Sequence, residues 1–465
     1  MALGTVGSLG LVLSGSKIGS GPQPASYRWW LTVPTNSYAL AHVFFYLSFA
    51  LLVVGWLGVG AHAFAGQLSA RRAWQAWGLW ATPLFLGTPL FSRDVYSYAA
   101  QGRLLVRGLN PYLVAPRALG PGPLLSSVAS VWRDTTSPYG PLFTELTQRV
   151  SEISGGSLIA QVLMLRTLEL VGVVMMMVAL PALARHFGVI EGVALWLGVL
   201  SPLALLSAVS SAHNDTLMLG LMAVALLAVV RGRRRWGLAL FALAATIKLP
   251  ALAGAVFVSV ATLRYARGRH LVTLVVEAIL VPALVIVAVT ELVGLGWTWL
   301  SPSALRTPTE LRVLITPTVS VGKLLSLALH AVGWRVATGT VVGLTQHLGE
   351  LLALVLVVAL LWKVRPSDRV WMLGSALLIV VLLSPTVWPW YFLWGLTVLA
   401  VTSAQSSVFL ALAAGLAMLL VGAGGTPMIG GNGVYVSGPA VVAGAGWFIA
   451  SGQWRSVWGG RDRVE

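Results

Sequence analysis

The 465-residue sequence contains no cysteine. Disulfide bonds, thiolate metal ligands and cysteine nucleophiles are therefore excluded. Charged residues are also scarce, at 9% of the chain against about 25% in a typical soluble domain. Acidic residues are the scarcest, with 14 Asp and Glu against 30 Lys and Arg, while 57% of the chain is hydrophobic. This composition excludes an ordinary soluble domain and is typical of a polytopic membrane protein.

The net charge of +16 is explained by short Arg-rich segments between apolar runs. Basic residues that recur on one side of a membrane mark the cytoplasmic side. The chain lacks the stripes of interleaved basic and aromatic residues that bind single-stranded nucleic acid, so we expect no nucleic-acid partner. The basic positions that alternate onto one side lie in 71–72, 185, 231–235, 264–269, 363–369 and 455–463.

Apolar runs that can cross or half-cross a membrane recur along the chain, a full crossing needing about 20 residues. They predict an all-α polytopic membrane protein with roughly 13–14 spans. Residues 1–16 would form a weak first span, and 236–263 fits either a helical hairpin or one long span. The remaining runs are 38–60, 74–92, 159–184, 188–208, 215–230, 271–294, 341–362, 370–385, 389–402, 406–424 and 436–452.

Two long segments, 93–158 and 295–340, fall on the side opposite to the Arg-rich turns. We therefore predict one transmembrane domain over 1–465, with these segments as its first and second extracytoplasmic loops. Turn-forming sequences at Asn110-Pro111 and around Tyr139 predict short helices lying in the membrane interface. A turn followed by a residue of the aromatic belt also explains Asn110-Pro111-Tyr112.

Asp94 directly follows an apolar run and begins the first long loop. A carboxylate at a membrane boundary needs solvent or a partner, and one within reach of a hydroxyl can act as a general base. The alternative is a helix N-cap, and the residue alone does not separate the two roles. Asp134 is either a second acid of the site or a loop residue paired with Arg133.

The second candidate cluster is the corner His213-Asn214-Asp215, which precedes an apolar run. These residues can cap a helix or contact a sugar or phosphate. No further His-rich cluster joins them, so we predict no metal site. Lys248 stands inside an apolar stretch beside a helix-breaking Pro250, where it can pair with a lipid phosphate or reach the interface as a snorkelling side chain.

The third candidate cluster is the corner Trp388-Pro389-Trp390-Tyr391. It is either an aromatic belt or a platform for a sugar ring or polyprenyl chain. Arg166 and Glu169 are one helical turn apart inside a span, which favours a structural pair over catalysis.

Six motifs occur in an order that resembles the actinobacterial polyprenyl-phosphate-mannose-dependent α-(1→6)-mannopyranosyltransferases, types A and B, of the GT-C superfamily. The resemblance covers about residues 38–402. The motifs are Phe91-Ser92-Arg93-Asp94-Val95-Tyr96-Ser97-Tyr98, Gly108-Leu109-Asn110-Pro111-Tyr112, Ser137-Pro138-Tyr139-Gly140-Pro141-Leu142, His213-Asn214-Asp215, Lys248-Leu249-Pro250-Ala251 and Trp388-Pro389-Trp390-Tyr391.

The resemblance implies a GT-C-type helix bundle in the plasma membrane, with its active site on the extracytoplasmic face. It implies transfer of mannose, with inversion, from a polyprenyl-phosphate-mannose donor to a lipid-linked mannan acceptor, with Asp94 as catalytic base and no cofactor. Arg93, His213 and Lys248 are the candidates for the leaving phosphate. The full set of candidate substrate-binding residues is Arg93, Tyr96, Tyr98, Asn110, Tyr112, Tyr139, His213, Asn214, Asp215, Lys248, Trp388, Trp390 and Tyr391.

Three alternatives remain at the level of sequence. A lipid-linked sugar flippase would place acids and Arg along a path through the bilayer and have short loops on both sides. A structural subunit of a cell-wall synthase would not need Asp94. An enzyme of the same superfamily could also use another polyprenyl-phosphate sugar, such as arabinose.

Overall fold

The computed structural model describes residues 1–22, 37–301 and 316–425, and within them the chain forms helices and no strands. The predicted run at 436–452 and the basic positions in 455–463 lie outside the described residues. The all-α polytopic fold predicted from the sequence is confirmed. Helices at the predicted spans are α1 (Ala2–Ile18), α2 (Tyr38–Phe64), α3 (Ala70–Leu86), α8 (Leu158–Phe187), α9 (Glu191–Gly198), α10 (Pro202–Leu205), α11 (Asp215–Val230), α12 (Arg234–Ala245), α13 (Leu252–Leu263), α14 (Gly268–Val293), α17 (Thr338–Lys363), α18 (Arg369–Leu383), α19 (Leu393–Leu399) and α20 (Ala404–Val421).

Shorter elements fill the connections between these helices. In the first long loop they are α4 (Asp94–Val106), η1 (Pro116–Leu119), α5 (Pro123–Ser127), α6 (Ser130–Arg133) and α7 (Pro141–Ile153). The others are a π-helical turn η2 (Leu206–Ser210), η3 (Leu249–Ala251), η4 (Thr298–Leu300), α16 (Pro317–Ala331) and η5 (Pro389–Phe392).

Four helices are long and apolar enough to cross a membrane alone: α2, α8, α14 and α17. A fifth candidate span is broken, because α9 and the helical segment Pro202–Ser210 meet at an angle of 52°. Several of the other predicted spans are apolar helices of 10–17 residues, which are short for a full crossing. Among the described residues, the structure therefore supports many apolar helices at the predicted places but few full-length spans.

The region 236–263 adopts the hairpin alternative and not one long span. Helix α12 ends at Ala245, and Pro250 stands in the first positions of η3, where its missing N–H is tolerated. Helices α12 and α13 pack against each other and against α14. Lys248 consequently lies at the turn of this hairpin, between two helices whose far ends carry Arg residues.

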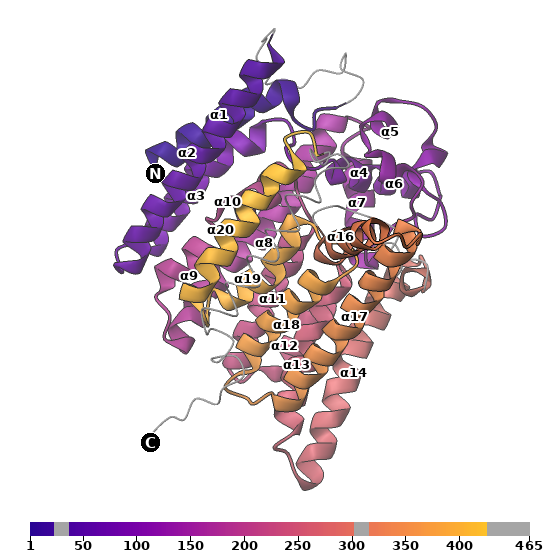
Figure 1. The fold of residues 1–465 in the computed structure, drawn as a ribbon. Coiled ribbons are helices and arrows are strands. Elements are labelled where there is room, and N and C mark those ends of the chain that lie inside the picture. The colour runs from indigo at the N-terminus through magenta and orange to yellow at the C-terminus, as the bar shows by residue number, and fades with distance from the viewer. Residues whose placement is uncertain (23–36, 302–315, 426–465) are drawn as a thin grey trace.

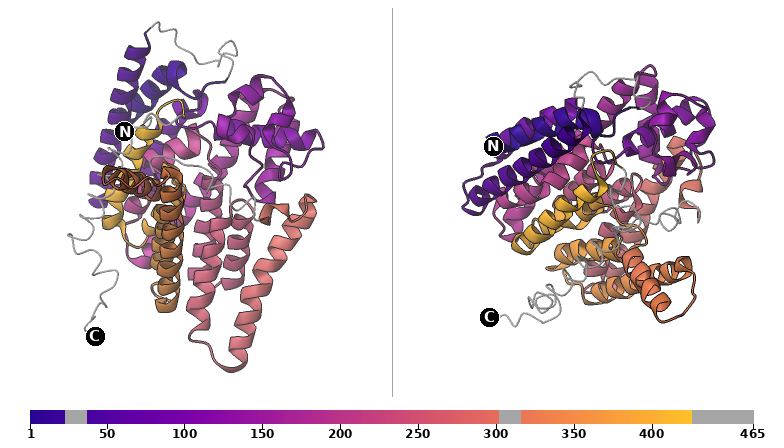
Figure 2. Two further views of the ribbon diagram at one scale, coloured as in Figure 1. Left: turned by 45° about the vertical axis from the view of Figure 1, so that its right-hand side comes forward. Right: turned by 45° about the horizontal axis from the view of Figure 1, so that its top comes forward.

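The two predicted outer loops lie at the same end of the bundle. Helices α4–α7 gather at one end of the molecule, whereas the turn between α13 and α14 lies at the opposite end (Figure 1 and the left view of Figure 2). The Asn110 side-chain amide donates to the carbonyl of Leu295 over 3.1 Å, which joins the first loop to the second. Polar segments from distant parts of the sequence thus meet at one end.

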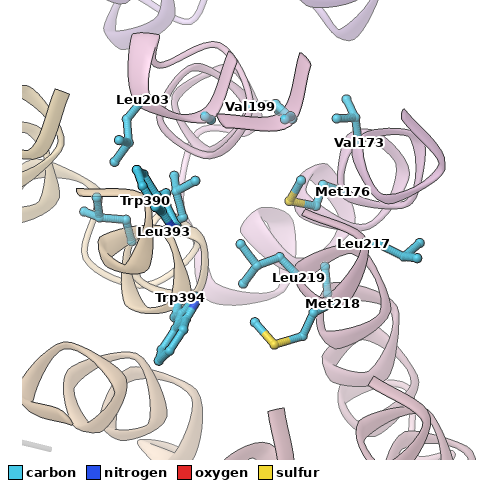
Figure 3. Packing of buried hydrophobic residues seen from close by; sticks show 14 of the residues in the cluster. Val173, Met176, Val199, Leu203, Leu217, Met218, Leu219, Trp390, Leu393 and Trp394 are labelled. Atoms are coloured by element: carbon cyan, nitrogen blue, oxygen red, sulfur yellow. The ribbon is translucent and has the colours of Figure 1, made fainter. Parts of the chain in front are cut away.

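Small residues allow the central helices to approach closely. A Cβ atom on Gly220 of α11 would lie 2.5 Å from the carbonyl oxygen of Gly172 on α8, which is the packing that membrane helices use in place of a hydrophobic driving force. Beside this contact, apolar side chains of α8, α11 and the η5–α19 segment form a buried layer that includes Trp390 and Trp394 (Figure 3). Two members of this layer, Trp390 and Trp394, also contact polar residues: Trp390 stacks on His213, and Trp394 donates to Asp215.

Candidate active site

Asp94 is the first residue of α4, and its carboxylate does not cap that helix. Arg93 is the N-cap residue and makes no side-chain cap. The Asp94 carboxylate instead accepts a hydrogen bond from Trp132 Nε1 at 2.8 Å, and its other oxygen lies 3.5 Å from His213 Nδ1. The Asp94 amide donates to Ser92 Oγ over 3.1 Å. Of the two roles left open by the sequence, the cap is therefore not the one that this carboxylate performs.

The surroundings of Asp94 make it a stronger base than an ordinary carboxylate. Its side chain is 13% exposed, and burial raises the pKa of Asp94 to about 6, an effect that the Trp132 hydrogen bond and the positive charge of Lys248 partly oppose. Burial, followed by the charge of Lys248, lowers the pKa of His213 well below its usual value. A neutral imidazole thus faces a carboxylate that is ionised near neutral pH.

Asp215 and Lys248 form a buried ion pair beside this couple. Lys248 Nζ donates to both carboxylate oxygens of Asp215, at 2.8 and 2.9 Å, and Trp394 Nε1 donates to one of them. Asp215 is fully buried, while the Lys248 side chain is 14% exposed and lies 4.5 Å from the centre of the Tyr391 ring. The sequence shows no acidic neighbour of Lys248; the structure supplies one from another helix.

Aromatic rings form the wall of the site next to these charges. The imidazole of His213 stacks on Trp390 with ring centres 3.8 Å apart, and Trp390 stacks on Trp388 at 5.0 Å. Tyr391 stacks on Trp394 at 4.7 Å. The corner that carries these rings is held by Gln346, whose side-chain amide donates to the carbonyl of Pro385. The predicted platform is therefore continuous with His213.

The first loop is fastened directly to the Lys248 corner. The amides of Gly140 and Leu142 donate to the carbonyls of Ile247 and Thr246, each over 3.0 Å. A Cβ atom on Gly140 would lie 2.2 Å from the Thr246 oxygen, so the approach requires glycine. Tyr139 packs edge-on against Tyr98 at 5.1 Å, and burial followed by the charge of Asp94 raises the pKa of Tyr139 well above its usual value. Tyr98 and Tyr139 thus join the cluster.

Backbone strain occurs in the segments that precede Asp94 and His213. Among the described residues, Phe91 and Ala212 are the non-glycine residues with positive φ, at 63° and 53°. Phe91 precedes Asp94 by three positions, and Ala212 precedes His213 directly. Strain of this kind costs of order 1–3 kcal/mol at each residue and collects at functional sites.

Buried polar atoms in the second corner have no protein partner. Within the described residues, neither ring nitrogen of His213 and neither polar atom of the Asn214 side chain makes a hydrogen bond, although both residues are fully buried. Leaving such groups unsatisfied costs about 1–3 kcal/mol each. This arrangement favours a ligand that brings hydroxyl groups to the corner.

Four other predicted site residues make contacts away from the ion pair. Arg93 donates to the carbonyls of Gly21 and Ser127, both at 3.2 Å. The Tyr96 hydroxyl is buried and donates to Ser20 over 2.8 Å, and the Tyr112 hydroxyl lies 3.0 Å from Thr144 Oγ1. Asn110 binds Leu295, as described above.

Two acidic residues mentioned in the sequence analysis have structural partners. Asp134 forms an exposed ion pair with Arg117, not with its neighbour Arg133, whose guanidinium binds the carbonyls of Ser126 and Val128. Glu169 accepts from the amide of Leu217 over 2.9 Å, and Arg166 donates to the carbonyls of Phe85, Gly87 and Ser210. In the part of the chain that the structure describes, no group of three His, Asp or Glu side chains is arranged to bind a metal.

Trp132 and Trp394 are the site residues that the sequence does not single out. Each donates its indole N–H to one of the two site carboxylates. With 20 Trp in the chain, most of which suit an aromatic belt, no local signal separates these two from the rest.

The chain matches two family models. The model described as alpha-(1->6)-mannopyranosyltransferase, N-terminal domain, matches residues 1–264, and the MptB C-terminal domain matches residues 318–447. The chain is 34% identical to alpha-(1->6)-mannopyranosyltransferase A of Mycobacterium tuberculosis, over 81% of this chain and 74% of that protein. It is 30% identical to alpha-(1->6)-mannopyranosyltransferase B of Corynebacterium glutamicum, over 86% and 72%. No solved structure matches.

Proposed function

Because the chain belongs to the α-(1→6)-mannopyranosyltransferase family, we propose that it transfers mannose from a polyprenyl-phosphate-mannose donor to a lipid-linked α-(1→6)-mannan acceptor with inversion. The observation that carries the proposal is the Asp94 carboxylate, which is partly exposed, hydrogen-bonded and ionised near neutral pH at the surface end of a helix bundle. The site faces the extracytoplasmic side of the plasma membrane.

In the proposed reaction, Asp94 removes the proton from the acceptor hydroxyl as that oxygen attacks the anomeric carbon of the donor. The new carbon–oxygen bond forms opposite to the breaking bond, so a β-linked donor gives an α-linked product. The electron pair of the breaking bond leaves with the polyprenyl phosphate. One displacement needs one base and no covalent intermediate.

The leaving phosphate needs positive charge or hydrogen-bond donors. Lys248 is the cation of the cluster, and two of its three N–H groups are directed to Asp215. The ion pair fixes the ammonium group against Tyr391, so that the third donor can serve the phosphate without reorganisation. We propose that Asn214 and His213 form hydrogen bonds with hydroxyl groups of the sugar, because their buried polar atoms lack partners among the described residues.

The experiment that tests the proposal is Asp94→Asn in membranes supplied with polyprenyl-phosphate mannose. Asparagine keeps the size of the side chain and an oxygen for Trp132, but it cannot take a proton. Loss of a general base lowers the rate by about 10²–10⁴-fold. Asp134→Asn is the matched control, because it removes an acid of the same loop whose carboxylate is committed to Arg117.

We expect normal protein levels for both variants, with transfer lost only in Asp94→Asn. Wild-type transfer by Asp94→Asn would refute the assignment of the base. If the protein were a flippase, Asp94→Asn would impair translocation of the lipid and not formation of the mannosyl linkage. Measuring the linkage therefore also distinguishes a transferase from a flippase.

A further inference from the structure

A pocket lies in the first long loop, apart from the Asp94 cluster. It has a volume of about 240 Å³ and lies between the end of α4, the η1–α5 turn and the start of α8. Arg103 is near the opposite end of α4 from Asp94, about 14 Å along the helix axis and roughly half a turn around it. The residues of this pocket that carry the argument are Arg103, Arg107, Leu124, Leu125, Leu158 and Gln161.

Two cations line one side of the pocket. Arg103 and Arg107 are four residues apart on α4, where like charges repel. The guanidinium of Arg103 has no hydrogen bond or ion pair with any described residue, and Arg107 donates to the carbonyl of Leu119 over 2.9 Å. An anion between the two guanidinium groups would relieve their repulsion and satisfy their free donors.

Gln161 supplies a buried acceptor on the other side. Its side chain is 2% exposed, and its Oε1 atom has no hydrogen-bond donor within the described residues. An unsatisfied buried carbonyl is unfavourable, and it would be satisfied by a hydroxyl of a ligand. The pocket therefore combines recognition of an anion with recognition of a hydroxyl group.

The position of α8 places this pocket at the membrane surface. This helix is 30 residues long, apolar enough to cross a membrane, and begins at Leu158 in the pocket wall. The N-terminal turn of α8 therefore contributes Leu158 and Gln161 to the pocket wall. Leu124, Leu125 and Leu158 add apolar surface beside the polar groups, as a ligand that is partly immersed in the bilayer would require.

We infer that this pocket binds the phosphate ester of a hydroxyl-bearing lipid headgroup. The guanidinium groups hold the phosphate, Gln161 accepts from a headgroup hydroxyl, and the leucines contact the start of the lipid tails. The inference does not rest on the proposed transfer reaction, because it uses none of the residues assigned to that reaction.

The test measures the thermal stability of the full chain in nanodiscs of phosphatidylglycerol or phosphatidylcholine. Phosphatidylglycerol carries the phosphate ester, the hydroxyls and a net negative charge, so we expect it to stabilise the wild-type chain more. Arg103→Gln and Gln161→Met should each weaken phosphatidylglycerol binding, measured by lipid competition, by about ten-fold. Arg335→Gln is the charge-matched control, because Arg335 is exposed and outside the pocket.

Each alternative outcome is decisive. If Arg335→Gln weakened phosphatidylglycerol binding as much as Arg103→Gln, only the overall charge of the protein would matter. The pocket would then not be the binding site. Unchanged binding by Gln161→Met would also contradict the proposal, since methionine keeps the length of the side chain but offers no oxygen to accept from the headgroup hydroxyl. If soluble glycerol 3-phosphate in phosphatidylcholine nanodiscs stabilised the chain as much as phosphatidylglycerol does, the ligand would be a free phosphate ester. The proposal of a lipid headgroup would then be wrong.

Discussion

At the scale of single residues, burial raises the pKa of Asp94, and the strongest opposing influence is the hydrogen bond from the Trp132 indole. Trp132 donates to the carboxylate and so lowers the pKa of Asp94, while burial raises it to a net value of about 6. A base must be ionised, so we expect kcat/KM for mannosyl transfer to fall as the pH decreases through about 6. The acid limb should have a slope of one proton if Asp94 alone controls it.

Trp132→Phe tests this dependence directly. Phenylalanine keeps an aromatic ring but cannot donate, so the pKa of Asp94 should rise and the acid limb should move to higher pH. A hydrogen bond to a charged group is worth about 1.5 kcal/mol, which corresponds to roughly one pH unit. Trp388→Phe is the control, because no hydrogen bond from its indole to Asp94 is present in the described structure. An acid limb that stays in place in Trp132→Phe would contradict this account of Asp94.

The individual partners of charged residues were the least predictable part of the site. The sequence offers the neighbouring Arg133 as a partner for Asp134, but the structure pairs Asp134 with Arg117. Lys248 and Asp215 are 33 positions apart, and nothing in the local sequence of either residue indicates the other. Residue types and turn signals identify a polar corner, whereas its partners depend on which helices pack together.

At the scale of elements, two backbone hydrogen bonds fasten the first long loop to the turn that carries Lys248. The amides of Gly140 and Leu142 both donate to carbonyls of the Thr246–Ile247 corner, which positions Tyr139 next to the hairpin that carries Lys248. Gly140 has a φ of −72°, so its role is close approach and not a special backbone conformation. Any side chain there must push the loop away from the corner.

We therefore expect Gly140→Ala to reduce transfer by about 10²-fold, since a displacement of about 1 Å in a site has effects of that size. Protein levels should fall only modestly. Gly78→Ala on α3 should be silent, because no atom lies within 4 Å of the added methyl group. Both variants can be compared by transfer rate per amount of folded protein. Full activity of Gly140→Ala would show that the alignment tolerates displacement of the loop.

The elements themselves follow largely from the sequence. Helices occur at the predicted apolar runs of the described chain because runs of apolar residues bounded by Pro, Gly and Arg leave few alternatives in a membrane. The bend between α9 and α10 and the π-helical turn η2 were not predicted. Both depend on packing: η2 carries Ser210, whose hydroxyl accepts from the amide of Leu90 and whose carbonyl accepts from Arg166.

At the scale of the whole molecule, the fold gathers polar loops at one end and Arg-rich turns at the other (Figure 1). The contact between Asn110 and Leu295 places both long loops at the same end. Short Arg-rich turns lie on the cytoplasmic side of membrane proteins. Because the Asp94 cluster is at the other end of the bundle, it should face outward. On that side the proposed lipid-linked donor could reach the site by diffusion in the bilayer, so the proposed reaction would not need nucleotide sugars there.

The absence of cysteine makes this orientation directly measurable. Single cysteines can be introduced by Ala118→Cys in the first loop and by Arg233→Cys in the turn between α11 and α12, and both positions are exposed. In intact cells, a membrane-impermeant thiol reagent should label Ala118→Cys. The same reagent should label Arg233→Cys only after the membrane is permeabilised. Each variant should also support transfer, which shows that its orientation is native. The reverse labelling pattern would place Asp94 inside the cell, and the proposal of an outward-facing site with a lipid-phosphate donor would then fail.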